Sequence, residues 1–376
     1  MKILQITPQA PSLNSGGGIG VAQTALSLFE NGYEVDYVGP PIEDASLAGV
    51  YRKHFILDAT TSKLIRFIDL LHGVTYRRYR AWKNLKIDFG QYDFFVMDFT
   101  KLDYVLKRIN PDKLIVRVHN VESEFVCVEY SKGFSAEGEI LKKLTPIREK
   151  KLVHAARELV FLTSKDRSRM QELYGSARHS TVVPVCVTEK QCEKSKKADG
   201  TVSLLYTGSL NFSANIQGIL WFINEVCPKL KVNYRLTVAG YHPTEELLRV
   251  PSENPKVQIV DTPENMTPYF ENADLVIAPV FDGAGMKVKV AEALSFGKPV
   301  LGTNHAYIGY KISDRNNSFV ANSVEEFAEQ INYFGSLPFE QREEIKDEAY
   351  ELFKSHYSIS TSASLWADIL EKDRTR

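Results

Sequence analysis

Short runs of β-branched and aromatic residues alternate with stretches of helical character along the chain, and this alternation restricts the fold more than any other feature. The runs in the first half are KILQIT, YEVDYVG, YDFFVMD, KLIVRVH, ELVFLTS and STVVPV, and those in the second half are VSLLYTGS, YRLTVAG, VQIVD, ADLVIAP and KPVLGT. Strands that alternate with helices form parallel sheets covered on both faces. The sequence therefore predicts an α/β protein with two doubly wound, Rossmann-like domains in tandem.

A polar stretch, TEKQCEKSKKADG at 188–200, separates the two series of runs. Its many charges and few large apolar residues are typical of a linker. We therefore predict an N-terminal domain over 1–187, a linker over 188–200 and a C-terminal domain over 201–355. A chain of 376 residues is long enough for two such domains, each with its own core.

Composition excludes several classes of protein. The 46 Lys and Arg residues balance 47 Asp and Glu residues, so nothing global favours a nucleic-acid partner. The sequence lacks an apolar run long enough to span a membrane, and its first residues lack the apolar region of a signal peptide. The four cysteines are scattered without a Cys-x-x-Cys pair, which argues against a zinc site and a disulfide framework. We expect a cytoplasmic protein.

The stretch FDGAGMKVKVAEALSFGKPV, residues 281–300, places two lysines after a Gly-Ala-Gly turn at the start of a predicted helix. Ligands of doubly wound sheets bind beyond the carboxyl ends of the strands, and a helix N-terminus attracts anions. Lys287 and Lys289 supply charges that a diphosphate would neutralise. Glu292 lies about one turn further along, where it is placed to accept hydrogen bonds from ribose hydroxyls. The alternative is an exposed Lys289–Glu292 pair beside a solvated Lys287.

Three consecutive glycines, Gly16 to Gly18, precede a predicted helix near the N-terminus. Their spacing does not complete the dinucleotide fingerprint G-x-G-x-x-G. A glycine run at a helix N-terminus still exposes backbone N–H groups, which suits a phosphate or sugar hydroxyls. The alternative is a flexible loop at a helix start.

The segment GAGMKVKVAEALSFGKPVLGT resembles the nucleotide-sugar site of retaining GT-B glycosyltransferases of family 4, in the subset with a Gly-Ala-Gly-x-Lys turn. In the family's order, GGGIGVAQTALSLFENGYEV resembles its N-terminal glycine loop, VHNVES (118–123) its histidine-bearing loop, and LLYTGSLNFSANIQGILWFINEV (204–226) the start of its second domain. The resemblance implies two Rossmann-like domains that face each other across a cleft. It also implies that a C-terminal helix, about 356–376, packs back on the N-terminal, acceptor-side domain.

The resemblance also implies roles for single residues. Lys287 would bind the donor diphosphate and stabilise it as the leaving group, Glu292 would hold the ribose hydroxyls, and His119 would contact the donor sugar. The other implied donor-binding residues are Gly17, Gly18, Gly208, Ser209, Asn215, Gly285, Met286 and Lys289. Two departures stand out: Ala284 occupies the place of a glutamate in the commoner family pattern, and Asn211 and Asn215 occupy the region of the usual Arg/Lys pair.

These residues and the resemblance predict a glycosyltransferase that moves a sugar from a nucleotide-diphosphate-sugar, with a UDP-sugar favoured, to a hydroxyl of a glycan, lipid-linked sugar or glycoprotein. Glycosyl transfer builds negative charge on the departing diphosphate, which lysines and a helix dipole stabilise. No Asp-x-Asp metal motif stands at a plausible strand end. We therefore expect transfer without a metal or cofactor, and the resemblance implies that it proceeds with retention. The alternatives are a non-catalytic partner of another transferase and a sugar-nucleotide epimerase, whose paired acid and base carboxylates we do not find.

The segment 62–86 carries seven Lys and Arg residues against a single acid, Asp69, with apolar residues interleaved. Such a basic amphipathic segment favours an anionic membrane surface. Arg77, Arg78 and Arg80 are therefore predicted to contact the membrane or the acceptor, which would place the protein at the inner face of the membrane and favour a lipid-linked acceptor. The alternative is a packed helix with a solvated basic face.

Overall fold

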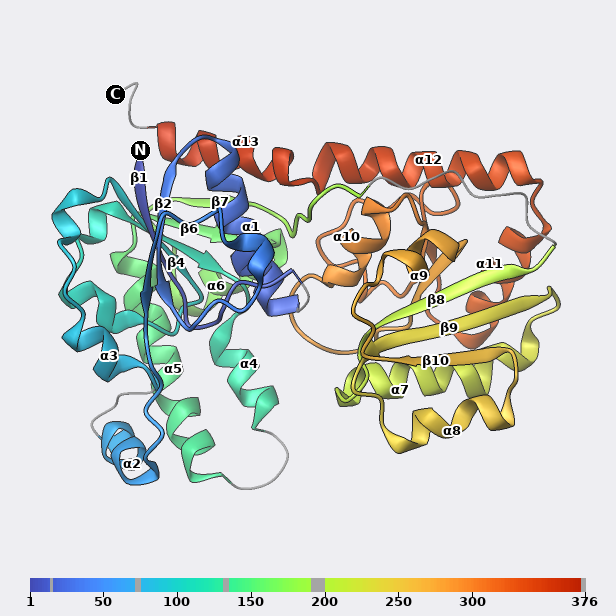
Figure 1. The fold of residues 1–376 in the computed structure, drawn as a ribbon, viewed down its shortest axis with the longest axis horizontal. Coiled ribbons are helices and arrows are strands. Elements are labelled where there is room, and N and C mark those ends of the chain that lie inside the picture. The colour runs from blue at the N-terminus through green and yellow to red at the C-terminus, as the bar shows by residue number, and fades with distance from the viewer. Residues whose placement is uncertain (14–15, 72–75, 131–134, 191–199, 373–376) are drawn as a thin grey trace. The chain divides into compact units, whose positions relative to one another are not determined.

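The computed structural model describes residues 1–13, 16–71, 76–130, 135–190 and 200–372, which form two compact domains (Figure 1). Domain 1 comprises 1–185 together with the C-terminal segment from Ser362, and domain 2 comprises Cys186–Thr361. Each domain is built on one parallel sheet with helices on both faces. The prediction of two Rossmann-like domains is confirmed.

Domain 1 contains a seven-stranded sheet in the order β3-β2-β1-β4-β5-β6-β7. The order reverses between β1 and β4, so a crevice is expected at the carboxyl ends of these two strands. The edge strand β3 was not predicted, because its sequence KHFI is short and mostly exposed. The strands are β1 Lys2–Ile6, β2 Glu34–Gly39, β3 Lys53–Ile56, β4 Phe94–Asp98, β5 Leu114–Val118, β6 Glu158–Phe161 and β7 Ser180–Val182.

The helices of domain 1 bury one apolar cluster on each face of this sheet. One cluster joins α1 to the last helix of the chain, whose Trp366, Ile369 and Leu370 are almost fully buried beside Ile3. The hydroxyl of Ser362, at the start of the same segment, pairs with Ser27 on α1 at 2.7 Å. The helices are α1 Gly16–Glu30, α2 Lys63–Leu71, α3 Tyr79–Asn84, α4 Glu122–Glu129, α5 Ala136–Ala155, α6 Ser164–Tyr174 and α13 Ile359–Glu371.

Domain 2 contains a six-stranded sheet in the order β10-β9-β8-β11-β12-β13, with its order reversal between β8 and β11. Connections between parallel strands are right-handed. Helices that connect strands on the two sides of the order reversal therefore cover opposite faces of the sheet. Accordingly, α7 and α8 lie on one face and α9 and α10 on the other (Figure 1). The strands are β8 Val202–Ser209, β9 Tyr234–Tyr241, β10 Val257–Asp261, β11 Leu275–Ala278, β12 Val300–Gly302 and β13 Phe319–Val320; the helices are α7 Ser213–Trp221, α8 Glu245–Glu253, α9 Thr267–Asn272, α10 Val288–Ser295, α11 Val324–Ser336 and α12 Phe339–His356.

None of the helices within the described ranges combines the length and the apolar character needed to cross a bilayer. The longest, α5, has 20 residues, and charged side chains are spread along it.

Candidate functional site

The Gly-Ala-Gly turn after β11 closes around the side chain of Lys287. Gly283 and Gly285 adopt positive φ angles of 104° and 68°, which residues with a Cβ adopt only with strain. The Lys287 ammonium donates hydrogen bonds to the carbonyl oxygens of Gly283 at 2.8 Å, Ala284 at 3.0 Å and Gly285 at 3.1 Å. His305 Nε2 lies 2.6 Å from the Gly283 carbonyl oxygen, so this nitrogen carries the proton. The turn therefore holds a cation at the carboxyl end of β11.

Helix α10 begins directly after this turn, with Lys287 as its N-cap residue. The Tyr310 hydroxyl donates to the Lys287 carbonyl at 2.8 Å and accepts from the Ala291 N–H at 3.3 Å. Val290 and Leu294 are fully buried, which fixes the helix against the sheet. The partial positive charge of the helix N-terminus is therefore added to that of the lysines.

Lys289 connects α10 to the loop after β8. Its ammonium lies 4.4 Å from the centroid of the Tyr206 ring and 3.3 Å from Asn215 Oδ1. A Cβ atom at Gly208 would lie 3.1 Å from both Lys289 Nζ and Asn215 Nδ2. Asn215 in turn donates to the Ser209 carbonyl at 3.0 Å. The structure thus brings four of the predicted donor-binding residues together at the switch point between β8 and β11.

Glu292 and the half-buried Lys289 influence each other's charge. Burial lowers the pKa of Lys289 to about 7, and the neighbouring Lys287 lowers it further, whereas Glu292 opposes the shift. Burial raises the pKa of Glu292 to about 7, against the influence of Lys289 and Lys190. A cation that loses charge through burial is stabilised again when an anion binds beside it. The side chain of Met286, also predicted in this site, is buried.

Gly240 lies beside Gly208 in the same group of residues, and we did not predict it from the sequence. It pairs in register with Gly208 across β8 and β9, and a Cβ atom at Gly240 would lie 1.8 Å from the Gly208 carbonyl oxygen. No side chain fits in that space. The sequence feature that could have predicted Gly240 is its position at the carboxyl end of the predicted strand YRLTVAG.

In domain 1, His119 lies just beyond β5 and is only 7% exposed. Its Nε2 atom is 2.9 Å from Asp98 Oδ1, and its ring stacks on Phe99 with a centroid distance of 4.1 Å. Since the carboxylate accepts, Nε2 carries the proton. Burial lowers the pKa of His119 despite the opposing effect of Asp98, so the ring is neutral near pH 7 with Nδ1 unprotonated.

Asp98 was not predicted, yet it organises this part of domain 1. Besides His119, it accepts hydrogen bonds from Gln5 Nε2 at 2.6 Å and from the Thr24 hydroxyl at 3.2 Å. A Cβ atom at Gly20 on α1 would lie 2.7 Å from His119 Cε1. The imidazole is therefore held between β4 and α1, and Asp98 fixes its tautomer. The available signal was an aspartate at the end of the run YDFFVMD.

The predicted glycines of the first loop lie in the opening turn of α1. A Cβ atom at Gly17 would lie 2.5 Å from Gln9 Nε2, and the Gly18 carbonyl accepts from the Ser12 N–H at 3.2 Å. Because the atoms beside Gly17 are the end of the flexible Gln9 side chain, Gln9 would shift to admit a side chain there. A role of the two glycines in donor binding stays a prediction.

Two buried glutamates, Glu122 and Glu149, lie at the N-terminus of α4. The sequence did not lead us to predict this pair. Glu149 on α5 accepts from the N–H groups of Glu122 at 2.9 Å and Ser123 at 3.2 Å, and from the Thr100 hydroxyl at 2.8 Å. Glu122 pairs with Lys101 at 2.9 Å, and burial raises the pKa of Glu122 to about 7. Glu149 therefore anchors the N-terminus of the helix that follows the His119 loop.

The basic segment 62–86 contains two short helices, α2 and α3, and its predicted membrane-contact arginines all make internal contacts. Arg80 makes a bidentate pair with Asp69, with a shortest distance of 2.8 Å. Arg78 donates to the Leu57 carbonyl at 2.6 Å, and Arg77 lies 3.5 Å from Glu137. Among the side chains of α2 that the structure describes, the large apolar ones that are exposed are Leu64, Phe67 and Ile68.

Metal ligands are not grouped in the parts of the chain that the structure describes, where no three His, Cys, Asp or Glu side chains come together in a possible metal site.

Solved structures of known proteins resemble this architecture. The chain is similar to sucrose-phosphate synthase from Thermosynechococcus elongatus, with a TM-score of 0.72 and 16% identity, covering 100% of this chain and 99% of that one. The chain is also similar to WaaG, a glycosyltransferase involved in lipopolysaccharide biosynthesis, with a TM-score of 0.69 and 14% identity, covering 98% of this chain and 99% of that one. A third similar structure is Anabaena HepE, solved with UDP and glucose, with a TM-score of 0.67 and 13% identity, covering 99% of this chain and 100% of that one. The chain has the GT-B fold.

Sequence comparison adds to the GT-B assignment. Residues 201–334 match the family model of glycosyl transferases group 1, and this range includes Gly208, the Gly-Ala-Gly turn and both lysines. An uncharacterized 44.6-kDa protein in the cps region of Klebsiella pneumoniae is 23% identical over 392 residues, covering 95% of this chain and 96% of that one. The family match in domain 2 together with the GT-B fold supports a glycosyltransferase.

Proposed function

We propose that the protein is a retaining glycosyltransferase, of the family 4 type with a Gly-Ala-Gly-x-Lys turn, that uses a nucleotide-diphosphate-sugar donor. The observation that carries the proposal is that Lys289 of α10 lies beside Gly208 at the switch point of domain 2, while Lys287 in the Gly-Ala-Gly turn caps the N-terminus of the same helix. Two lysines and a helix dipole suit a diphosphate. HepE, which shares the fold, was solved with UDP and glucose, which supports a UDP-sugar as donor.

The lysines stabilise the departing diphosphate more strongly than the intact donor, because negative charge grows on it during transfer. Asn211 and Asn215 stand where the family usually has an Arg/Lys pair, and Lys289 from α10 reaches Asn215 at 3.3 Å. Lys289 therefore supplies from the helix side the charge that this loop lacks. Two lysines and the helix dipole take over charge neutralisation, so we propose transfer without a metal ion.

His119 is the proposed contact for the donor sugar in domain 1. Asp98 holds Nε2–H at 2.9 Å and fixes the tautomer, which leaves Nδ1 as a hydrogen-bond acceptor. The acceptor substrate is a hydroxyl of a glycan, a lipid-linked sugar or a glycoprotein.

Ala284 favours a second candidate, a non-catalytic partner of another transferase, because the commoner family pattern has a glutamate there. Turnover separates the two functions. The purified protein is incubated with UDP-sugars and glycan acceptors, released UDP is quantified, and the anomeric configuration of the product is read by NMR. We expect release that depends on acceptor, with retained configuration; an inverted product would contradict the mechanism, and no turnover with any pair would favour the partner function.

Attachment to an anionic membrane surface is proposed for α2, and contact of Arg77, Arg78 and Arg80 with the membrane or the acceptor stays a prediction. Leu64 and Phe67 are 69% and 54% exposed beside the basic Lys63. An exposed apolar helix face flanked by basic residues suits the interface of an anionic bilayer. This attachment would bring the protein to the inner face of the membrane.

A further inference from the structure

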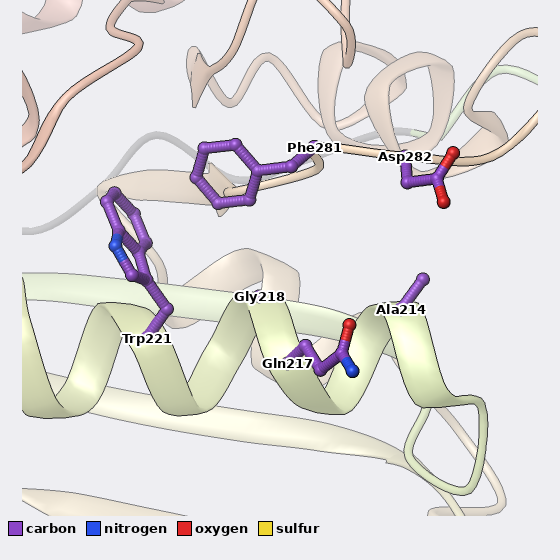
Figure 2. A pocket seen from close by; sticks show the side chains of 6 residues that line it. All are labelled: Ala214, Gln217, Gly218, Trp221, Phe281 and Asp282. Atoms are coloured by element: carbon purple, nitrogen blue, oxygen red, sulfur yellow. The ribbon is translucent and has the colours of Figure 1, made fainter.

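A cavity of about 330 Å³ in domain 2 lies beside the proposed diphosphate turn and is not used by the proposed chemistry. One wall is a single face of α7, with residues at helical spacing, and the other is the segment that enters the Gly-Ala-Gly turn (Figure 2). Its size lies at the lower end of the range for small-ligand sites. The lining residues are Ala214, Gln217, Gly218, Trp221, Phe281 and Asp282.

One end of the cavity is aromatic and fixed in place. The rings of Trp221 and Phe281 meet edge to face, with centroids 4.8 Å apart. Trp221 also packs edge to face against Phe327, which is fully buried in the domain 2 core, at 5.3 Å. Phe281 is nevertheless 49% exposed. A rigid aromatic platform is thus presented to solvent at the cavity.

The other end is polar. Asp282 Oδ1 accepts from the Gly283 N–H at 2.6 Å, which holds the carboxylate against the turn. The Gln217 amide is exposed and makes no hydrogen bond to any residue that the structure describes. Both side chains lie at the end of the cavity away from the Trp221 ring (Figure 2). The amide both donates and accepts, and the carboxylate accepts.

This combination selects one class of ligand. A ring with C–H groups on its face packs on the aromatic side chains, while hydroxyl groups around its edge bind the amide and the carboxylate. Among the residues that line the cavity, Asp282 is the charged one. Its negative charge repels a phosphate or another anion. A neutral sugar ring meets both requirements.

We propose that the cavity between α7 and the segment 281–282 binds a neutral sugar unit of the glycan acceptor or product. The proposal rests on the proposed glycosyltransferase function and adds to it a carbohydrate subsite in the donor-binding domain. Phe281 and Asp282 directly precede Gly283, so a sugar bound here lies at the edge of the same turn that holds Lys287.

Tryptophan fluorescence tests the proposal on the full chain. Of the three tryptophans in the sequence, Trp82 and Trp366 are almost fully buried, so Trp221 is the one that a ligand reaches. Lactose, maltose, cellobiose and chitobiose are titrated into the wild type and into Phe281→Ala and Gln217→Ala. Phe212→Ala is the matched control, because Phe212 is similarly exposed, at 58%, and does not line the cavity. UDP binding is measured in parallel by calorimetry.

We expect at least one disaccharide to change the fluorescence of the wild type in a saturable way. Phe281→Ala should weaken this binding by about tenfold or more, Gln217→Ala should weaken it as well, and Phe212→Ala should not. UDP should bind all four proteins equally. A wild type that binds UDP but no disaccharide, or a response unchanged in Phe281→Ala, would overturn the sugar site alone. Sugar binding without UDP binding would instead support the cavity and count against the proposed donor site.

Discussion

At the scale of single residues, Lys287 and Lys289 are only two positions apart but have different surroundings. Lys287 is bound by three carbonyl oxygens of its own turn, whereas Lys289 lies over the ring of Tyr206 and touches Asn215. The sequence predicted both lysines as anion ligands from their place after the glycine turn. It did not predict the lowered pKa of Lys289, because that shift depends on burial by β8 and its loop, about 80 residues away.

Nucleotide affinity should therefore depend on pH through Lys289. The free protein loses this charge with a pKa of about 7, and a bound diphosphate favours the charged form, so binding takes up a proton. We expect the affinity for UDP to fall as the pH rises above about 7, by up to about tenfold per pH unit. Calorimetry between pH 6 and 9 measures this effect.

The variant Lys289→Met tests the assignment. It should bind UDP more weakly than the wild type at pH 6 and should lose most of the decline above pH 7. A decline of the same steepness in Lys289→Met would show that another group takes up the proton.

Glu122 should make the stability of domain 1 fall as the pH rises. Burial raises its pKa to about 7, above the unfolded value near 4.3, so the folded state binds more protons in that interval. The stabilisation present in acid is lost as the pH rises from about 4 to about 7. Glu122→Gln should remove this loss and raise the free energy of unfolding at pH 8, by an amount on the order of 3 kcal/mol.

Urea unfolding of domain 1 at pH 5 and pH 8 measures the difference. Glu43→Gln, at an exposed position of domain 1 that does not influence the pKa of Glu122, is the matched control and should change stability little at either pH. If Glu122→Gln gave the same change at both pH values, the raised pKa of Glu122 would be refuted.

At the scale of elements, the sequence predicted the strands that lie inside the sheets and missed those at two edges. Interior parallel strands are buried on both faces and appear as continuous apolar runs. The edge strand β3 is polar and mostly exposed, and β13 has only two residues, so neither produces such a run. The composition of the segment 62–86 was evident from the sequence, but its contacts were not, because the pair of Arg80 with Asp69 joins two separate helices.

Helix α2 should determine membrane attachment. Leu64→Ser combined with Phe67→Ser removes exposed apolar area without disturbing a core, so the double variant should fold normally. We expect the wild type to float with phosphatidylglycerol vesicles and the double variant to lose most of this binding. Leu248→Ser on α8, where Leu248 is 51% exposed, is the control and should float like the wild type. Equal flotation of all three proteins would refute attachment through α2.

At the scale of the whole molecule, residues 1–185 and most of helix α13 belong to the same domain. The sequence predicted the two sheets from the repeated alternation of runs, which is a local signal. The partners of the last helix are not local: Ser362 bonds to Gln23, 339 residues earlier. Only the resemblance to a family, and not the periodicity of the tail, indicated where this helix packs.

The return of α13 should be essential to domain 1. Trp366 is fully buried among residues of β1, β2 and α1, so Trp366→Ala should destabilise domain 1 by about 3–5 kcal/mol. Amide hydrogen exchange of β1 and β2 measures this loss, with β8 and β9 of domain 2 as an internal reference. Asp368→Ala, on the exposed side of the same helix, should leave exchange unchanged. Unaltered protection of β1 and β2 in Trp366→Ala would contradict the role given to α13.

The central claim is that domain 2 holds a nucleoside diphosphate at the Gly-Ala-Gly turn. Its most direct test is calorimetric titration of the purified protein and of Lys287→Ala with UDP, GDP, dTDP and ADP in the presence of EDTA. We predict micromolar binding of one nucleotide, UDP, that weakens by about tenfold or more, or about 1.4 kcal/mol, in Lys287→Ala. Failure of all four nucleotides to bind the wild type, or equal binding by the variant, would contradict the account.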